Sequence, residues 1–74
     1  MKKSYLFLAD GFEEIEALTV VDIMRRAEMP LVTLSINDKP VVTGAHNIPV
    51  VADALAQDVS FEDAEWLILP GGMP

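Results

Sequence analysis

Cysteine is absent from this chain of 74 residues, and histidine occurs only once, as His46. Neither a disulfide nor a cysteine-based zinc site can therefore stabilise the fold, and one histidine offers little toward any other metal centre. We expect no metal site and no bound cofactor. The same absence means that residues 1–74 provide no thiolate nucleophile.

Basic residues are also scarce, with five lysines and arginines against twelve aspartates and glutamates and a net charge of −7. A chain of this charge repels phosphate backbones, which excludes nucleic acid as a simple electrostatic partner. Long hydrophobic runs are missing too, because the run 5–9 is too short for a signal peptide or a membrane span and Asp10 ends it. The sequence predicts a soluble cytoplasmic protein without a membrane partner.

Hydrophobic residues make up 51% of the chain, which is a high content for its length. A chain of this size buries a small fraction of its surface, so this content predicts burial against something outside residues 1–74. That partner would be the remainder of a larger domain, a second chain, or both. Because an apolar segment runs directly into Gly71 and Gly72 at the end, we expect the N-terminal part of an α/β domain.

Three apolar segments predict the main strands, at 5–9, 31–36 and 66–69. The first shows no alternation, which is typical of a strand that is covered on both faces in a parallel sheet. Acidic residues at the start and arginines at the end predict a helix over 13–28, because both complement the helix dipole. A strand, a helix and a strand in this order predict a right-handed βαβ unit.

The other segments are less regular. Asp10 lies three residues before Glu13, which is the spacing of a capping box at the start of the helix. Two prolines remove donors from any β-ladder after the second main strand, so only short strands can form there. We expect edge strands or a small hairpin at 41–42 and 48–51, and helical turns at 52–56 and 61–64.

One carboxylate projects into the apolar face of the predicted helix on a helical wheel. Glu16 falls inside this face, whereas Glu14 falls toward its outer side, next to Arg25. A carboxylate against apolar surface needs a partner or a function, and desolvation favours its protonated form. Such a group can donate a hydrogen bond to a thiolate; alternatively, Glu16 caps backbone amides or pairs with a basic group. The apolar face consists of Ala17, Val20, Val21, Ile23, Met24 and Ala27.

Two glycines follow the last predicted strand. Gly71 and Gly72 suit either an oxyanion hole built from backbone amides or a plain turn after Pro70. If the first and last strands are neighbours, Glu16 and these glycines face one crevice at the carboxyl ends of the strands, where open α/β sheets place their sites. His46 is expected to be a solvated loop histidine rather than a catalytic one.

Three segments together carry a resemblance to a known family. They are Leu-Ala-Asp-Gly-Phe-Glu-Glu-Ile-Glu-Ala at 8–17, Asp-Ile-Met-Arg-Arg-Ala at 22–27 and Leu-Ile-Leu-Pro-Gly-Gly at 67–72. They resemble the N-terminal part of the ThiJ/PfpI superfamily, closest to the branch that holds the Parkinson-disease protein deglycase and its bacterial relatives. The resemblance implies a flavodoxin-like parallel sheet sandwiched by helices, with residues 1–74 as the N-terminal part of one such domain.

The resemblance also implies roles for individual residues. Glu16 matches the glutamic acid that hydrogen-bonds the family's reactive cysteine and supports its thiolate. Gly71 and Gly72 match backbone amides beside that cysteine. Arg26 matches an arginine near the dimer interface that approaches the partner's site, and Ile15 falls on the part of the helix that packs across the dimer.

The family's reactive cysteine would lie beyond Pro74, together with the histidine associated with it, so His46 does not match that histidine. The resemblance implies an intact protein that acts on small reactive carbonyls in glyoxalase- or deglycase-like chemistry, or that senses oxidation. It would be a homodimer or pair with a complementing C-terminal chain, and the 74-residue chain alone would be inactive. The alternatives are a cysteine-dependent peptidase or amidase of the same superfamily, a non-enzymatic partial domain that complements another chain, and an unrelated flavodoxin-like binding domain.

Overall fold

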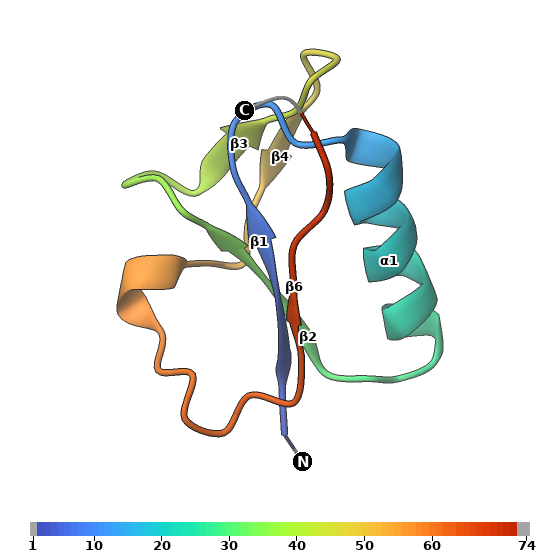
Figure 1. Ribbon diagram of the computed structural model, residues 1–74, viewed down its shortest axis with the longest axis vertical. Helices are drawn as coiled ribbons and strands as arrows, with labels where there is room; N and C mark the ends of the chain where they lie inside the picture. The colour runs from blue at the N-terminus through green and yellow to red at the C-terminus, as the bar shows by residue number, and fades with distance from the viewer. Residues whose placement is uncertain (1, 73–74) are drawn as a thin grey trace.

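The main sheet consists of parallel strands in the order β5–β2–β1–β6 (Figure 1). The computed structural model describes residues 2–72. Within this range the sheet contains β1 (Ser4–Leu8), β2 (Leu31–Ser35), β5 (Ala54–Leu55) and β6 (Leu67–Ile68). Because β1 lies between β2 and β6, the chain adds β2 on one side of β1 and later adds β6 on the opposite side. This arrangement confirms the predicted parallel sheet and creates a topological switch point at the carboxyl end of β1.

One helix, α1 (Glu14–Arg26), joins β1 to β2 and packs on one face of the sheet (Figure 1). The helix predicted over 13–28 is therefore correct in position and slightly shorter. It ends in a Schellman motif, in which the N–H of Met29 donates to the Met24 carbonyl at 2.9 Å and Glu28 takes the left-handed conformation at φ 58°. This local geometry, rather than the following proline alone, ends the helix.

The two faces of β1 make different contacts. Leu6 and Leu8 are fully buried and share the core cluster with Ala17 of α1. On the opposite face, the ring of Phe61 lies near the rings of Tyr5 and Phe7, with centroid distances of 5.2 and 5.5 Å. Both faces of β1 are therefore covered, which explains why its sequence shows no alternation of apolar and polar residues.

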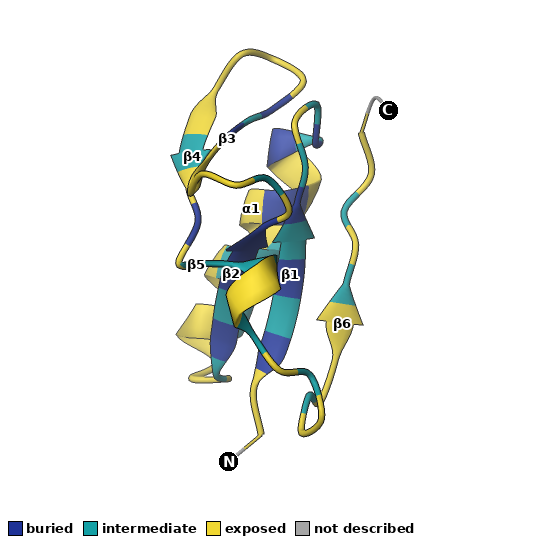
Figure 2. Ribbon diagram, turned by 90° about the vertical axis from the view of Figure 1, so that its left-hand side faces the viewer, coloured by how far each residue is buried: buried dark blue, intermediate teal, exposed yellow. Residues whose placement is uncertain are grey.

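The apolar face predicted for α1 is only partly correct. Ala17 is buried, but Ile23 is 59% exposed and Ala27 is exposed as well. A helical wheel assigns every residue of the apolar face to the core. The narrow sheet, however, covers only one side of the helix, so residues at the margin of that face stay exposed. Figure 2 shows exposed stretches of α1 behind the sheet and the exposed edge at β6. No helix within residues 2–72 is long and apolar enough to cross a membrane.

A second, smaller sheet is the predicted antiparallel hairpin. It consists of β3 (Val41–Thr43) and β4 (Pro49–Val51), with Val42 opposite Val50 in its centre. Val42 is fully buried and belongs to the main core cluster, so the hairpin is attached to the rest of the molecule by its apolar side. Its tip lies beside the start of α1 (Figure 1).

The helical turn predicted at 52–56 is wrong. This segment contains β5 and the beginning of a 3₁₀ helix, η1 (Ala56–Asp58). Asp53 explains the difference, because its N–H donates to the Thr33 carbonyl at 3.0 Å and its carboxylate accepts the Thr33 N–H at 2.9 Å. These bonds hold the segment extended along β2. At 61–64 the structure has a turn and no helix.

Candidate active site

The loop after β1 and the segment after β6 meet at one end of the sheet (Figure 1). Gly71 donates its N–H to Glu16 Oε1 at 2.9 Å, and its carbonyl accepts the Glu13 N–H at 2.7 Å. Gly72 forms an antiparallel bridge with Phe12. The predicted meeting of Glu16 with the two glycines at the switch point is therefore present, while their chemical roles stay predictions.

Both glycines lie close to the residues that follow β1, and Gly72 lies so close to their backbone that only glycine fits there. A Cβ atom on Gly71 would overlap the Glu16 carboxylate, and a Cβ atom on Gly72 would overlap the Gly11 carbonyl and the Phe12 backbone. Gly72 also has φ 148°, a conformation that residues with side chains rarely adopt. The segment after Pro70 is thus packed closely against the loop that follows β1, which a plain turn would not require.

The surroundings of Glu16 differ from those predicted. The residue is exposed rather than set against apolar surface, and its Oε1 accepts the Gly71 N–H. While this hydrogen bond lasts, the Gly71 amide is not free to stabilise a different anion. The oxyanion role of Gly71 and Gly72 therefore requires an incoming group to replace the Glu16 carboxylate on the amide.

A pocket of about 480 Å³ opens beside this contact. Asp10 lies at the pocket, and its carboxylate accepts the Thr43 N–H at 3.0 Å and a hydrogen from Asn37 Nδ2 at 3.3 Å. The predicted capping box is wrong, because Glu13 makes no side-chain capping bond and Asp10 binds the hairpin instead. The apolar lining includes Phe7, Phe12, Ile36 and Leu69.

Glu14 is only 4% exposed, a burial that its predicted place toward the outer side of the apolar face did not indicate. Its Oε2 accepts the N–H groups of His46 at 2.7 Å and Ile48 at 3.4 Å, and its Oε1 lies 2.8 Å from His46 Nδ1. Burial alone would raise the pKa of Glu14, but hydrogen bonds from the His46 ring and from backbone N–H groups outweigh it and lower the pKa from 4.5 to about 2. Glu14 is therefore an anionic anchor for the hairpin tip.

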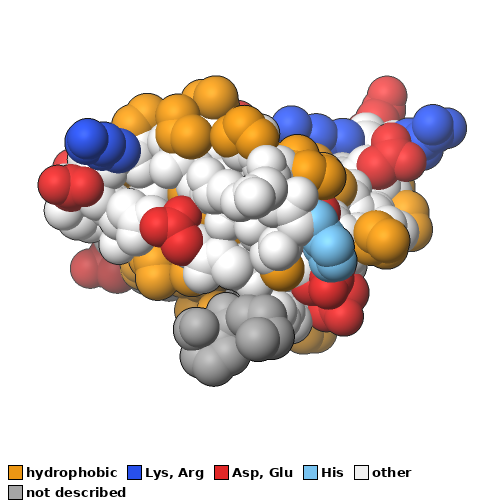
Figure 3. Space-filling model, turned by 90° about the horizontal axis from the view of Figure 1, so that it is seen from above, with side chains coloured by type: hydrophobic (Ala, Val, Ile, Leu, Met, Phe, Trp, Pro, Cys, Tyr) orange, Lys and Arg blue, Asp and Glu red, His pale blue; other side chains and the backbone are white. Residues whose placement is uncertain are grey.

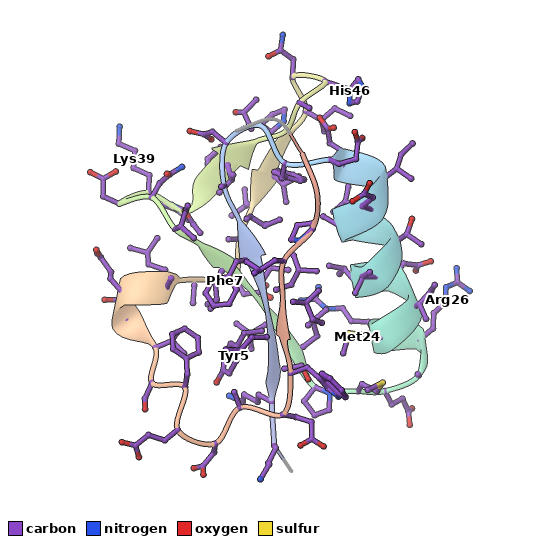
Figure 4. All side chains as sticks on the ribbon, viewed as in Figure 1. Tyr5, Phe7, Met24, Arg26, Lys39 and His46 are labelled. Atoms are coloured by element: carbon purple, nitrogen blue, oxygen red, sulfur yellow. The ribbon has the colours of Figure 1, made fainter. Side chains whose placement is uncertain are left out.

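His46 lies at the surface, as predicted, but it is not free. Its side chain is 66% exposed, and Nδ1 lies 2.8 Å from Glu14 Oε1 and 3.5 Å from Glu13 Oε1. The hydrogen bond to Glu14, followed by the charges of Glu14 and Glu13, raises the pKa of His46 above its usual value. Figure 3 shows the ring at the surface beside acidic side chains, and Figure 4 places it at the hairpin tip near the start of α1.

Glu13, Glu14 and His46 are also the described side chains that could share a metal ion, because their donor atoms lie within 4.8 Å of one another. The Glu14 oxygens already accept hydrogen bonds from the His46 ring and two backbone N–H groups. The group is therefore satisfied as an ion pair without a metal. The sequence pattern did not predict this group, since a helical wheel relates Glu14 only to the sheet and not to the hairpin.

The two residues predicted at a dimer interface have exposed side chains. Ile15 is 76% exposed, and the Arg26 guanidinium binds the Asp22 carboxylate, with 3.0 Å between Nε and Oδ1. Arg26 lies at the far end of α1 from Glu16, about 15 Å away along the helix axis, and points away from the sheet (Figure 4). Its part in the site would therefore require a second copy of the chain, and the interface roles stay predictions.

The sequence pattern of the DJ-1/PfpI family matches residues 2–74. The chain belongs to the DJ-1/PfpI family. Protein DJ-1 homolog B of Arabidopsis thaliana is 33% identical over 73 residues, which cover 99% of this chain and 17% of that relative. YraA of Bacillus subtilis (strain 168), whose name assigns it provisionally to the cysteine proteases, is 32% identical over 71 residues, covering 96% of this chain and 42% of that relative. The chain thus spans less than half the length of these DJ-1/PfpI relatives.

Solved structures of the DJ-1 superfamily share the fold. Oxidized Toxoplasma gondii DJ-1 matches with a TM-score of 0.93 and 35% identity, covering all of this chain and 40% of that structure. A cysteine-to-alanine mutant of a DJ-1 superfamily protein from Salmonella typhimurium matches with a TM-score of 0.91 and 39% identity, covering 97% and 39%. These similarities confirm the resemblance stated from the sequence and the α/β, flavodoxin-like fold class.

Proposed function

We propose that residues 1–74 form the N-terminal part of a single DJ-1/PfpI domain whose complete form acts through a cysteine on small reactive carbonyls, in glyoxalase- or deglycase-like chemistry, or senses oxidation. The contact between the Gly71 N–H and the Glu16 carboxylate is the observation that carries this proposal. It brings an acid and a backbone donor to the carboxyl ends of parallel strands, beside an apolar pocket. Open α/β sheets bind their ligands at such a switch point.

In this proposal the thiolate comes from outside residues 1–74, because the chain contains no cysteine. The Glu16 carboxyl group, when protonated, donates a hydrogen bond to the sulfur and favours the thiolate. The amides of Gly71 and Gly72 then stabilise the oxyanion that forms when the sulfur attacks a carbonyl carbon. The chain alone would have no such activity, and the cytoplasm suits the reduced thiol that the complete protein requires.

The test uses the complete polypeptide that carries these residues, with methylglyoxal as the carbonyl substrate. Replacing the proposed cysteine with serine should abolish methylglyoxal consumption, and Glu16→Gln should shift the pKa of the thiol and change its oxidation product while the fold is retained. Asp22→Asn, a carboxylate change on the exposed side of the same helix, is the matched control and should leave both properties unchanged. Undiminished activity without the cysteine would exclude the thiolate mechanism.

A second candidate is a cysteine-dependent peptidase or amidase of the same family, which the provisional name of the Bacillus subtilis relative favours. Hydrolysis of an amide would use the same thiolate and oxyanion donors on a different carbonyl. Amide hydrolysis in the absence of methylglyoxal turnover would support this candidate. A non-enzymatic partial domain that complements another chain is a third, for which the exposed Leu67 and Leu69 at the edge of the sheet are the supporting observation.

We also propose that the complete protein forms a homodimer through α1. Ile15 is 76% exposed, and it lines a shallow surface pocket together with Leu18 of the same helix and Ile48 of the hairpin. Covering such apolar side chains with a second copy would remove them from water. Ile15→Glu should therefore lower the mass measured by sedimentation from that of a dimer to that of a monomer.

A further inference from the structure

The tip of the β3–β4 hairpin is attached to α1 through one buried carboxylate. Glu14 binds the N–H groups of His46 and Ile48 through Oε2 and the His46 ring through Oε1. Gly44 makes room for this group, since a Cβ atom there would overlap the Glu14 carboxylate. We call the Glu14 carboxylate, the His46 ring and the two N–H groups the Glu14–His46 latch.

The same hairpin is bonded to the loop that carries the candidate active site. The N–H of Ala45 donates to the Phe12 carbonyl at 2.8 Å, directly beside the latch. Phe12 in turn pairs with Gly72, and the N–H of Glu13 donates to the Gly71 carbonyl at 2.7 Å. The loop is thus held by the hairpin on one side and holds the glycine segment on the other.

We propose that Glu14 and His46 are positioning residues that couple the protonation of His46 to the contact between Glu16 and Gly71. With His46 protonated, the latch is closed and the glycine segment is held against Glu16. With His46 neutral, the latch weakens and this contact loosens. The consequence for catalysis rests on the proposed function, whereas the coupling itself does not.

The charges around His46 set the direction of the effect. Glu14 and Glu13 of the helix start both face the ring, at 2.8 and 3.5 Å from Nδ1, while Asp10 binds Thr43 and Glu16 binds Gly71. A protonated His46 ring donates a stronger hydrogen bond to the Glu14 carboxylate than a neutral ring does. The raised pKa of His46 means that the added stability is complete below pH 6.5 and is lost as the pH rises through the raised value.

The test follows the Gly71 amide signal and the His46 ring signal by NMR in the complete polypeptide, between about pH 5.5 and 9 around the ordinary histidine pKa. We expect the two signals to move with a common midpoint. His46→Asn keeps a neutral side-chain donor near the position of Nδ1, so the Gly71 movement should vanish while the fold remains. Glu13→Gln is the matched control: it removes the more distant charge, and the common midpoint should fall while the coupling persists.

Two outcomes would overturn the proposal. One is a Gly71 signal that does not follow the His46 midpoint, and the other is a Gly71 titration that survives in His46→Asn. Because the NMR signals are measured without substrate, failure of methylglyoxal turnover would refute the proposed function and leave the coupling intact. If both proposals hold, the pH profile of thiol reactivity should show an inflection at the His46 midpoint that is lost in His46→Asn.

Discussion

Glu14 and Glu16 lie two positions apart at the start of α1, yet their surroundings are opposite. Glu14 is 4% exposed and accepts hydrogen bonds from the His46 ring and from the N–H groups of His46 and Ile48. Glu16 is exposed and binds the Gly71 N–H. Residues advance about 100° each along a helix, so these two side chains project in nearly opposite directions. One reaches the hairpin and the other reaches the glycine segment.

This difference separates a carboxylate that anchors from one that can exchange its partner. A buried carboxylate with several donors is held in place, because removing any donor leaves a desolvated charge unsatisfied. An exposed carboxylate can release a single donor to water or to an incoming group with little loss of stability. Glu16 is therefore the residue of the two that is able to act on a bound group, and Glu14 keeps the surrounding elements in position.

The largest expected effect comes from Gly72→Ala, which disturbs the segment that Glu16 contacts at its backbone. The new Cβ atom would overlap the Gly11 carbonyl and the Phe12 backbone, and φ 148° is unfavourable for alanine. We expect a loss of unfolding free energy on the order of 1–3 kcal/mol from the strained conformation alone. Urea unfolding of the complete polypeptide measures it, and unchanged stability would show that the segment is not held as described.

The next effect is the response of the Glu14 anchor to acid. Its pKa is about 2 in the folded state against 4.5 when unperturbed, so the unfolded chain binds the proton more readily. The stability that Glu14 contributes is therefore complete above pH 4.5 and is lost as the pH falls toward 2. Urea midpoints across this range should fall more steeply for the wild type than for Glu14→Gln. A wild-type slope in Glu14→Gln would contradict the role of Glu14 as an anionic anchor.

The main elements of the fold could be predicted from local patterns, whereas the Glu14–His46 latch could not. The apolar run at 5–9 and the charge distribution of 13–28 are local signals, and they predicted β1 and α1 correctly. Glu14 and His46 are 32 positions apart, and their contact depends on how the hairpin packs beside the helix. No helical wheel contains that information.

A partner distant in sequence also explains why the helical turn predicted at 52–56 is wrong. Asp53 binds Thr33, which lies 20 positions earlier, and this partner keeps the segment extended along β2 where the local sequence predicts a helical turn. In contrast, the meeting of Glu16 with Gly71 was predictable, because it follows from the strand order. Neighbouring parallel strands bring their carboxyl ends together whatever their separation in sequence.

Smaller and unequal losses of stability are expected when the two glycines that lie against the two carboxylates are replaced by alanine. A side chain at Gly44 would displace the Glu14 carboxylate, and a side chain at Gly71 would displace the Glu16 carboxylate. Gly44→Ala should lower the Tm clearly, because Glu14 must leave its buried donors. Gly71→Ala should change the unfolding free energy by no more than about 0.5 kcal/mol, since Glu16 is exposed and can turn toward solvent. Equal falls in Tm would contradict the distinction between anchor and exchangeable group.

The smallest effect is expected for Asp22, a third carboxylate of α1, which is exposed and accepts no hydrogen bond from a backbone N–H group of the described residues. Asp22 pairs with Arg26 at 3.0 Å, and the two side chains are 61% and 79% exposed. Asp22→Asn should reduce the unfolding free energy by about 0.3–0.5 kcal/mol, as is typical of an exposed pair one helical turn apart. The difference should disappear in about 1 M salt, where the Debye length falls to about 3 Å. A larger loss that persists in salt would mean that this side of α1 is covered in the complete protein, which would support the proposed dimer. Asp22 would then be a buried carboxylate like Glu14 rather than an exposed one like Glu16.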